Sequence, residues 1–278
     1  MAGCVDDVGG TQEVIRETDG SENMFDVEAY CSQYCSLDPS TADPFEVPSL
    51  KSRMKIIHDY YQLIGLKDAR VLEYGSGPSV YSLIGAVPYC REIVISEYDV
   101  RSRDFLSKWK NGQANHHITT LFQYAVMSIE KLGEGDEVSQ RENALRQLIS
   151  GIYPGDLNTD TPIEMDSPGL FDIISTHFTC HTVCMSVDEF RAAVGRLVKF
   201  LKPGGFLILS EILECELGKW DGLKVGYKGF QLTRESLIEC IEQLGFINIK
   251  DDVVAEEPID GKAPPEFGKT LTLLAQAP

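Results

Sequence analysis

Glycines and an acid follow two predicted strands of this chain, and their spacing suits a ligand that carries a sugar. The short apolar run Val71–Tyr74 is typical of a buried strand, and Gly75-Ser76-Gly77-Pro78 follows it directly. Glycines at such a turn let the backbone approach a ligand closely. Glu97 comes 22 positions after Gly75, and a carboxylate there can accept hydrogen bonds from both hydroxyls of a ribose. A tight turn and a solvated strand-end charge are the simpler interpretations of the same residues.

The glycine turn differs from the fingerprint of a dinucleotide site. The pattern G-x-G-x-x-G needs a third glycine where this chain has Val80. Pro78 and Tyr81 are also bulky for a loop that cradles a pyrophosphate. These departures disfavour an NAD-dependent dehydrogenase and favour a ligand without pyrophosphate.

Two more predicted strand ends carry groups that can recognise a nucleoside. Gly155-Asp156-Leu157 follows a third strand, where Asp156 can accept a hydrogen bond from an adenine amino group and Leu157 can pack on the ring. Thr176 ends the apolar run Phe171–Thr176. Ligands of parallel α/β sheets bind outside the carboxyl ends of the strands. The four strand ends together therefore fit an adenosine ligand without phosphate.

Strands and helices alternate along the chain, and this predicts a mostly parallel sheet with helices on both faces. Further strands are predicted at Glu92–Tyr98, Phe206–Glu211 and Thr270–Ala275. Helices are predicted from Ser49 to just before Gly65, and at Arg101–Trp109, Glu130–Ile149, Asp188–Leu201 and Ser236–Leu244. Residues 1–23 are acidic and aperiodic, which predicts a flexible tail. Residues 24–278 are predicted to form one domain.

Composition narrows the class of partner. The chain has 43 acidic and 25 basic side chains among 278 residues, a formal charge of −18, and such a surface repels nucleic acids and anionic lipid. The N-terminal residues lack the basic and apolar blocks of a signal peptide. We therefore expect a small-molecule partner, no nucleic acid or membrane partner, and a cytoplasmic location.

The eight cysteines do not have the spacing of a metal site. Cys31 and Cys35 lie four positions apart, as do Cys180 and Cys184, whereas zinc sites usually show C-x2-C with a second pair nearby. A disulfide framework is not typical of a cytosolic chain of this length. We expect free thiols and no metal.

Three motifs together give the chain a resemblance to a known family. They are F-x-x-x-x-Y-x-x-x-Y from Phe25, the strand turn L-E-Y-G-S-G-P-S-V-Y, and L-K-P-G-G-F-L. Through them the chain resembles the animal small-molecule N-methyltransferases of the nicotinamide, phenylethanolamine and indolethylamine group, from Phe25 to the C-terminus. The resemblance implies a Rossmann-like class I methyltransferase fold, with a seven-stranded mostly parallel sheet, an N-terminal helical lid and S-adenosylmethionine as cofactor.

The same resemblance assigns contacts to the cofactor. From the methionine part to the adenine they are Tyr30, Tyr34, Tyr81, Gly75, Ser76, Gly77, Thr176, Glu97, Ser102, Asp156 and Leu157. Ser102 falls where relatives place an asparagine on the ribose. The family's second tyrosine in the first helix aligns with either Tyr34 or Cys35.

The resemblance places the methyl acceptor at the loops after the fourth and fifth strands. A substrate amine attacks as a neutral molecule and becomes cationic, so carboxylates stabilise the charge and a base removes a proton. His181, with an unperturbed pKa of about 6.5, and Glu211 are the candidate catalytic residues, and a packed histidine is the alternative for His181. The candidate substrate contacts are Tyr30, Glu211, Glu214, Cys215 and Glu266.

We therefore predict a monomeric N-methyltransferase that uses S-adenosylmethionine to methylate a small amine. A nicotinamide or pyridine N-methyltransferase is the alternative enzyme, although the serine that helps bind nicotinamide in relatives falls on or beside Gly229. A scaffold or sensor that binds the cofactor without turnover is the alternative outside enzymes.

Overall fold

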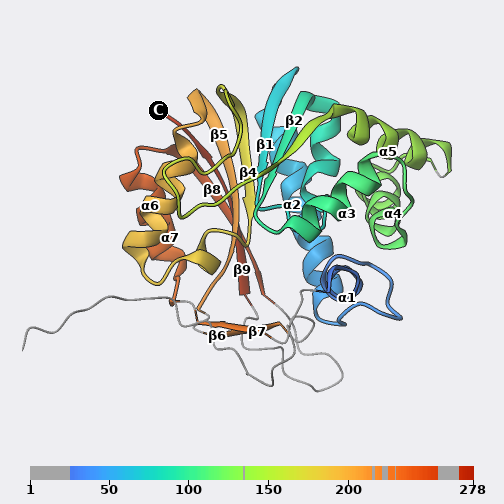
Figure 1. Cartoon of the computed structure of the whole chain (residues 1–278), viewed down its shortest axis with the longest axis horizontal. Coiled ribbons are helices and arrows are strands. Elements are labelled where there is room, and N and C mark those ends of the chain that lie inside the picture. Colours follow the sequence, from blue (N-terminus) through green and yellow to red (C-terminus); the bar gives the residue numbers. More distant parts are fainter. Residues whose placement is uncertain (1–25, 134, 215–216, 221–224, 229, 256–268) are drawn as a thin grey trace, which may run out of the picture.

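One seven-stranded sheet runs through the centre of the molecule (Figure 1). The computed structural model describes residues 26–133, 135–214, 217–220, 225–228, 230–255 and 269–278. The strand order in the sheet is β3-β2-β1-β4-β5-β9-β8. The strands of this sheet are β1 (Ala69–Tyr74), β2 (Cys90–Glu97), β3 (Ile149–Pro154), β4 (Phe171–His177), β5 (Leu201–Ile212), β8 (Ile247–Ala255) and β9 (Lys269–Gln276).

Only β9 breaks the parallel pattern among these strands, because it pairs antiparallel with both β5 and β8. The pairs β1–β2, β1–β4, β2–β3 and β4–β5 are all parallel. The prediction of a seven-stranded, mostly parallel sheet is therefore confirmed.

Helices cover both faces of the sheet. They are α1 (Val27–Tyr34), α2 (Glu46–Ile64), the 3-10 helix η1 (Tyr81–Tyr89), α3 (Val100–Lys110), α4 (His116–Gln123), the π-helix η2 (Tyr124–Ile129), α5 (Asp136–Leu148), the 3-10 turn η3 (His181–Val183), α6 (Val187–Val198) and α7 (Arg234–Gln243). One apolar cluster packs α2, η1, α3, α4 and α5 on one face, and a second packs α6 and α7 on the other. Successive residues of a strand point to opposite faces of the sheet, so Val71 packs in the first cluster and Leu72 in the second. The central strands are apolar along their length because both faces are buried.

The start of α2 differs from the sequence-based prediction. The helix begins at Glu46 rather than at Ser49, because the Asp43 carboxylate accepts hydrogen bonds from the backbone N–H groups of Phe45 (2.8 Å) and Glu46 (3.3 Å). Pro48 is tolerated there because the first turn of a helix leaves its N–H groups unpaired. Gly65 ends the helix in the left-handed conformation, with φ 62°, as predicted.

Other predicted boundaries were wrong where a helical period continued into a strand. The helix predicted to end at Leu201 ends at Val198, and Leu201 begins β5. The helix predicted over Glu130–Ile149 begins at Asp136, and Ile149 begins β3. The sequence analysis did not predict α4, η2, β8 or the two-stranded hairpin of β6 (Leu217–Trp220) and β7 (Val225–Lys228).

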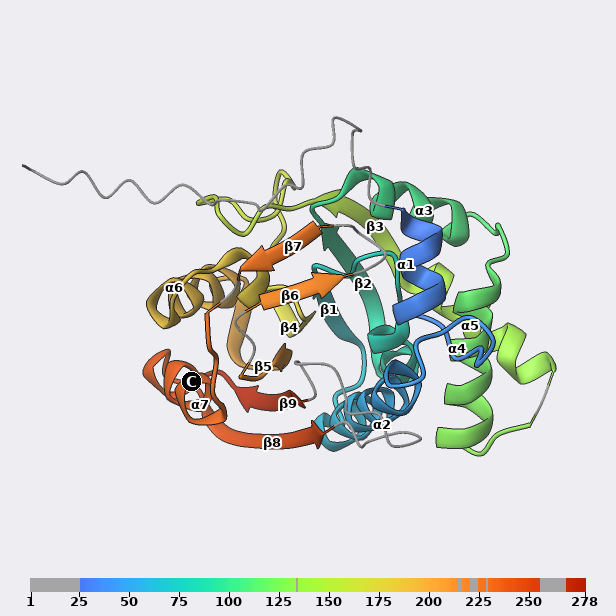
Figure 2. The ribbon, with the colours of Figure 1, turned by 90° about the horizontal axis from the view of Figure 1, so that it is seen from below.

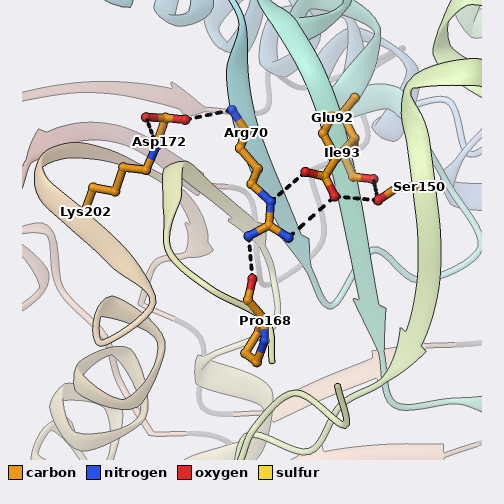
Figure 3. Close-up of polar contacts among 7 residues, drawn as sticks. All are labelled: Arg70, Glu92, Ile93, Ser150, Pro168, Asp172 and Lys202. Atoms are coloured by element: carbon orange, nitrogen blue, oxygen red, sulfur yellow. Dashed lines mark hydrogen bonds and ion pairs between the residues drawn. The ribbon is translucent and has the colours of Figure 1, made fainter. Parts of the chain in front are cut away.

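A network of charged side chains joins five strands at the amino end of the parallel sheet (Figure 3). Arg70 on β1 donates from Nε to Glu92 Oε2 on β2 (2.7 Å) and from Nη1 to the Pro168 carbonyl. Ser150 on β3 also donates to Glu92, from Oγ to Oε1 (2.9 Å). Asp172 on β4 accepts from the Arg70 backbone N–H (2.9 Å) and from Lys202 Nζ on β5 (2.7 Å). The hydrogen bond from Arg70 holds the pKa of Glu92 below its usual value.

We predict that Arg70→Met lowers the free energy of unfolding by about 1–3 kcal/mol, because it breaks a partly buried ion pair and unpairs the Pro168 carbonyl. The lowered pKa of Glu92 means that this stabilisation is present at neutral pH and is lost as the pH falls through that pKa. Urea unfolding at pH 7 and at pH 3 measures both effects.

The matched control is Lys55→Met, which breaks the exposed pair of Lys55 with Asp59 and should cost about 0.5 kcal/mol or less. An equal loss from both variants, or a loss for Arg70→Met that stays the same at pH 3, would contradict the structural role of the network.

Candidate active site

The carboxyl ends of the parallel strands meet at the edge that α1 and the β6–β7 hairpin overlie. Figure 1 places both elements below this edge, and Figure 2, viewed from below, shows the hairpin across the ends of β1 and β4 with α1 beside it. The loops after β1, β2, β3, β4 and β5 all open at this edge. The strand-end residues singled out from the sequence therefore share one region of the molecule.

The turn after β1 is held in a conformation that only glycine adopts without strain. Gly75 has φ 69° and Gly77 has φ 56°. A Cβ added at Gly75 would lie 2.1 Å from Thr179 Oγ1, whereas no atom of the described residues lies within 4 Å of a Cβ added at Gly77. Gly75 is thus packed against Thr179, whereas the space beside Gly77 is open, so a ligand can approach the backbone there.

Glu97, at the end of β2, is anchored to this turn. Its Oε2 accepts the Gly77 backbone N–H and its Oε1 accepts the Asp99 backbone N–H, both at 2.8 Å. Burial raises the pKa of Glu97, and the two backbone hydrogen bonds oppose that rise. Each carboxylate oxygen accepts two hydrogen bonds, so one site on each oxygen remains for a ribose hydroxyl.

The loop after β3 carries the residues predicted to contact adenine. Gly155 lies against Ser96, so closely that a Cβ there would meet Ser96 Oγ at 2.1 Å. Asp156 is half-buried, and its Oδ1 accepts the Asn158 backbone N–H at 2.9 Å. Leu157 is buried, and its carbonyl accepts Arg196 Nε from α6 at 2.8 Å. The loop is therefore fixed from both sides.

The helical lid contacts the glycine turn directly. The Cys31 thiol of α1 donates to the Pro78 carbonyl at 3.4 Å, and the rings of Tyr30 and Tyr34 lie 5.2 Å apart. Burial raises the pKa of the Tyr30 hydroxyl, and the nearby Cys35 and Tyr81 side chains raise this pKa further. Tyr30, Cys35 and Tyr81 thus lie near one another, while Tyr34 lies beside Tyr30.

Tyr81 carries a hydroxyl that is buried and has no hydrogen-bond partner in the described part of the chain. Buried polar atoms are nearly always paired, so this hydroxyl is suited to a polar ligand group. The Tyr81 ring lies 5.8 Å from that of His177, whose Nε2 and Nδ1 pair with Ser175 Oγ (2.9 Å) and Ser210 Oγ (2.7 Å). Burial, with Arg53 nearby, lowers the pKa of His177 to about 3.

Two predicted cofactor residues are buried among protein groups. The Ser102 hydroxyl donates to Asp99 Oδ2 at 3.1 Å, and Asp99 caps α3 through the Ser102 backbone N–H. Thr176 is 1% exposed and neighbours the Cys180 thiol. The structure thus places Ser102 behind the β2 loop and Thr176 at the end of β4.

His181 and Glu211, the predicted catalytic pair, are brought together from adjacent strand ends. His181 Nδ1 contacts Glu211 Oε2, and Glu211 Oε1 accepts the Cys180 backbone N–H at 3.2 Å. Glu211 is 0% exposed and His181 is 4% exposed. Glu211 therefore holds both the His181 ring and the backbone of the loop that carries it.

Of the other predicted acceptor contacts, Glu214 pairs with a surface lysine. Glu214 is exposed and forms an ion pair with Lys269 Nζ at 2.9 Å. Cys215 and Glu266, like residues 1–25, lie outside the described residues. The structure therefore gives Glu214 a surface partner at the base of the hairpin.

Several residues at this edge were not singled out from the sequence. Tyr98 follows Glu97 and is 74% exposed, so its ring is available for stacking on a base. Arg53 of α2 is buried, donates to Ser49 Oγ (2.6 Å) and Glu46 Oε2 (3.0 Å), and lies 5.0 Å from the Phe178 ring. The position of Tyr98 directly after the strand-end acid is a signal that sequence analysis can use, whereas Arg53 appears only through tertiary packing.

A sequence profile of the NNMT/PNMT/TEMT family matches residues 13–259. The chain belongs to this family. It is 24% identical over 238 residues to the indolethylamine N-methyltransferase of Mus musculus, covering 84% of this chain and 86% of that one. It is also 24% identical over 210 residues to the nicotinamide N-methyltransferase of Sus scrofa, covering 74% and 77%.

The fold agrees with this membership. The N-methyltransferase NodS of Bradyrhizobium japonicum, solved with S-adenosyl-L-homocysteine, aligns with a TM-score of 0.51 and 15% identity over 91% of this chain and 96% of that one. An S-adenosylmethionine-dependent methyltransferase of Methanosarcina mazei aligns with a TM-score of 0.52 and 14% identity over 80% and 96%. The predicted class I methyltransferase fold is confirmed.

Membership also confirms the predicted enzyme class, an N-methyltransferase with S-adenosylmethionine as methyl donor. The residues of this chain fit that cofactor, because the turn is open at Gly77, the two Glu97 oxygens retain acceptor capacity and the Tyr81 hydroxyl is unpaired among the described residues. No helix in the described ranges is long and apolar enough to cross a bilayer.

We predict that Gly75→Ala costs about 2–4 kcal/mol of stability, because it combines a positive φ with overlap on Thr179. Gly77→Ala shares the positive φ without the overlap, so it should cost about 1 kcal/mol. Urea unfolding of the two variants isolates the overlap, and equal losses would contradict the close approach at Gly75.

We predict that the affinity for S-adenosylhomocysteine falls as the pH is lowered, and that it falls at a higher pH than for an ordinary glutamate. The reason is the raised pKa of Glu97, since a protonated carboxyl loses acceptor sites for the ribose. Calorimetric titration between pH 4.5 and pH 8 measures the effect.

The control is Glu97→Gln, which should bind roughly 10–100-fold more weakly and lose this pH dependence. A pH dependence that persists in Glu97→Gln would contradict the assignment of Glu97 to the ribose.

Proposed function

We propose that this protein transfers the methyl group of S-adenosylmethionine to the nitrogen of a small amine that still carries a proton. The pairing of His181 with Glu211 carries the proposal. An alkyl amine is an ammonium ion at neutral pH and must give up a proton before its nitrogen can attack, so a nearby base accelerates the reaction. A pyridine nitrogen has no proton to lose and needs no base. The pair therefore favours an amine over nicotinamide as the acceptor.

The residues around the pair suit this role. Glu211 fixes the orientation of the His181 ring through Nδ1, and an imidazole is a suitable base near neutral pH. Glu211 thus supports His181 and stabilises the imidazolium that forms, rather than contacting the acceptor itself. His177 is unsuited to this work, because its ring nitrogens are both paired and its lowered pKa, about 3, makes it a poor base.

The edge of the sheet supplies positioning. S-adenosylmethionine, when bound, would supply a sulfonium methyl group, and its sulfur would leave in line as the amine nitrogen takes the methyl. The strands β1 and β4 are neighbours, so the glycine turn that would hold the methionine part adjoins the loop that carries His181. Holding reacting groups in line can contribute an effective molarity of about 10⁵ M or more. The chain's main task is thus to hold cofactor and amine at adjacent strand ends.

The proposal is tested by a product assay with the full chain. Purified protein and S-adenosylmethionine are mixed with aliphatic amines, aromatic amines, indolethylamines and pyridines, and mass spectrometry detects the methylated products. We expect methylated amines in preference to methylated nicotinamide. A preference for pyridines would overturn the amine assignment, and tight cofactor binding without turnover on any acceptor would favour a scaffold.

We predict that His181→Asn lowers kcat/KM for the best amine by about 10²–10⁴-fold. The asparagine amide can take the place of Nδ1 and keep the bond to Glu211, but it cannot act as a base. Initial rates of the wild type and of His181→Asn with the same amine measure the effect.

The control is His116→Asn, at an exposed histidine paired with Asp38, which should leave the rate unchanged. An unaltered rate in His181→Asn would show that His181 is not the base.

A further inference from the structure

The loop after β4 is tied to β5, to α2 and to the glycine turn after β1. Phe178 has φ 56°, a conformation that non-glycine residues rarely adopt, and its backbone N–H donates to the Ser210 carbonyl of β5 at 2.7 Å. Its ring lies 5.0 Å from the Arg53 guanidinium of α2. The next residues, Cys180 and His181, bind Glu211. The loop is thus held in a single, locally unfavourable conformation by its surroundings.

Thr179 joins this loop to the glycine turn. Its Oγ1 lies 3.1 Å from the Gly75 carbonyl and 3.1 Å from the His177 carbonyl, so one hydroxyl proton is shared between two acceptors. Thr182 Oγ1 donates back to the Thr179 carbonyl at 2.7 Å, which closes the loop on itself. Gly75 and Thr179 are 104 positions apart in the sequence, so this contact links two segments that otherwise meet only through the sheet.

Thr179 also fills the space beside Gly75. Its Cγ2 lies 2.4 Å, and its Cβ 2.8 Å, from where a Cβ of residue 75 would be. The threonine therefore occupies the space that a side chain at position 75 would fill. Thr179 can pack against the turn only because residue 75 is a glycine.

We propose that Thr179 is a positioning residue that sets the distance between the cofactor turn and the His181–Glu211 pair. The inference rests on the proposed function, in which the turn holds the cofactor and His181 accepts the proton. His181 lies two positions after Thr179, so a shift at Thr179 moves the base and the methyl donor relative to each other. Small displacements of this kind lower the rate of the chemical step while leaving each ligand bound.

The test compares Thr179→Val, which keeps the shape and removes the hydroxyl, with Thr179→Ser, which keeps the hydroxyl and removes the methyl group. We expect Thr179→Val to lower kcat by about 10–100-fold, with affinity for S-adenosylhomocysteine within about threefold of the wild type. Thr179→Ser should restore most of the rate. The control Thr119→Val removes a threonine bond of similar kind, from Oγ1 to the Asn115 carbonyl in α4, and should leave kcat unchanged.

Hydrogen exchange gives a readout that does not depend on turnover. In Thr179→Val the backbone N–H groups of Phe178 and Cys180, which bind Ser210 and Glu211, should exchange faster than in the wild type, while those of α4 should not. Equal behaviour of the valine and serine variants in both kcat and exchange would overturn the proposal. If the wild type has no methyltransferase activity the proposed function fails, yet faster exchange in Thr179→Val would still establish the link between loop and turn.

Discussion

The arrangement of the site follows from one constraint, which is that β1 lies between β2 and β4 in a parallel sheet. Because parallel strands end at the same edge, the turn after β1 is flanked on one side by Glu97 and on the other by the loop of Thr179 and His181. The Gly77 N–H donates a hydrogen bond to Glu97, and the Gly75 carbonyl accepts one from Thr179. Glu97 and the loop of Thr179 and His181 thus lie on opposite sides of the turn after β1.

The central strands could be predicted from the sequence because apolar runs buried on both faces leave a clear pattern, whereas the family and its fold class followed from the resemblance of three motifs. Gly75, Gly77 and Glu97 were also predicted, and the structure places both glycines in one turn, where the Gly77 N–H donates to Glu97. Their types are dictated by backbone conformation and by a carboxylate at a strand end, which are local properties visible in a single chain. Gly75 illustrates this, since its positive φ is a property of the turn itself.

What the sequence did not predict depends on contacts between distant segments. Arg53 meets Phe178, and Thr179 meets Gly75, only after the helices and loops have packed. The boundary errors have a local origin: the period of α6 continues toward Leu201, and the strand pairing of Leu201 with Phe171 decides the assignment. Likewise, α2 begins at Glu46 rather than at Ser49, because the Asp43 carboxylate accepts hydrogen bonds from two backbone N–H groups before the predicted start.

The charged network at the amino end of the sheet has a consequence for how the family can diversify. Its hydrogen bonds and ion pairs connect β3, β2, β1, β4 and β5 at the edge opposite the loops of the candidate active site. Substitutions, insertions and changes of loop length at the carboxyl edge therefore leave these contacts untouched. Such a scaffold can exchange one acceptor for another over evolutionary time, or in directed evolution, without first having to find a new way to hold its strands together.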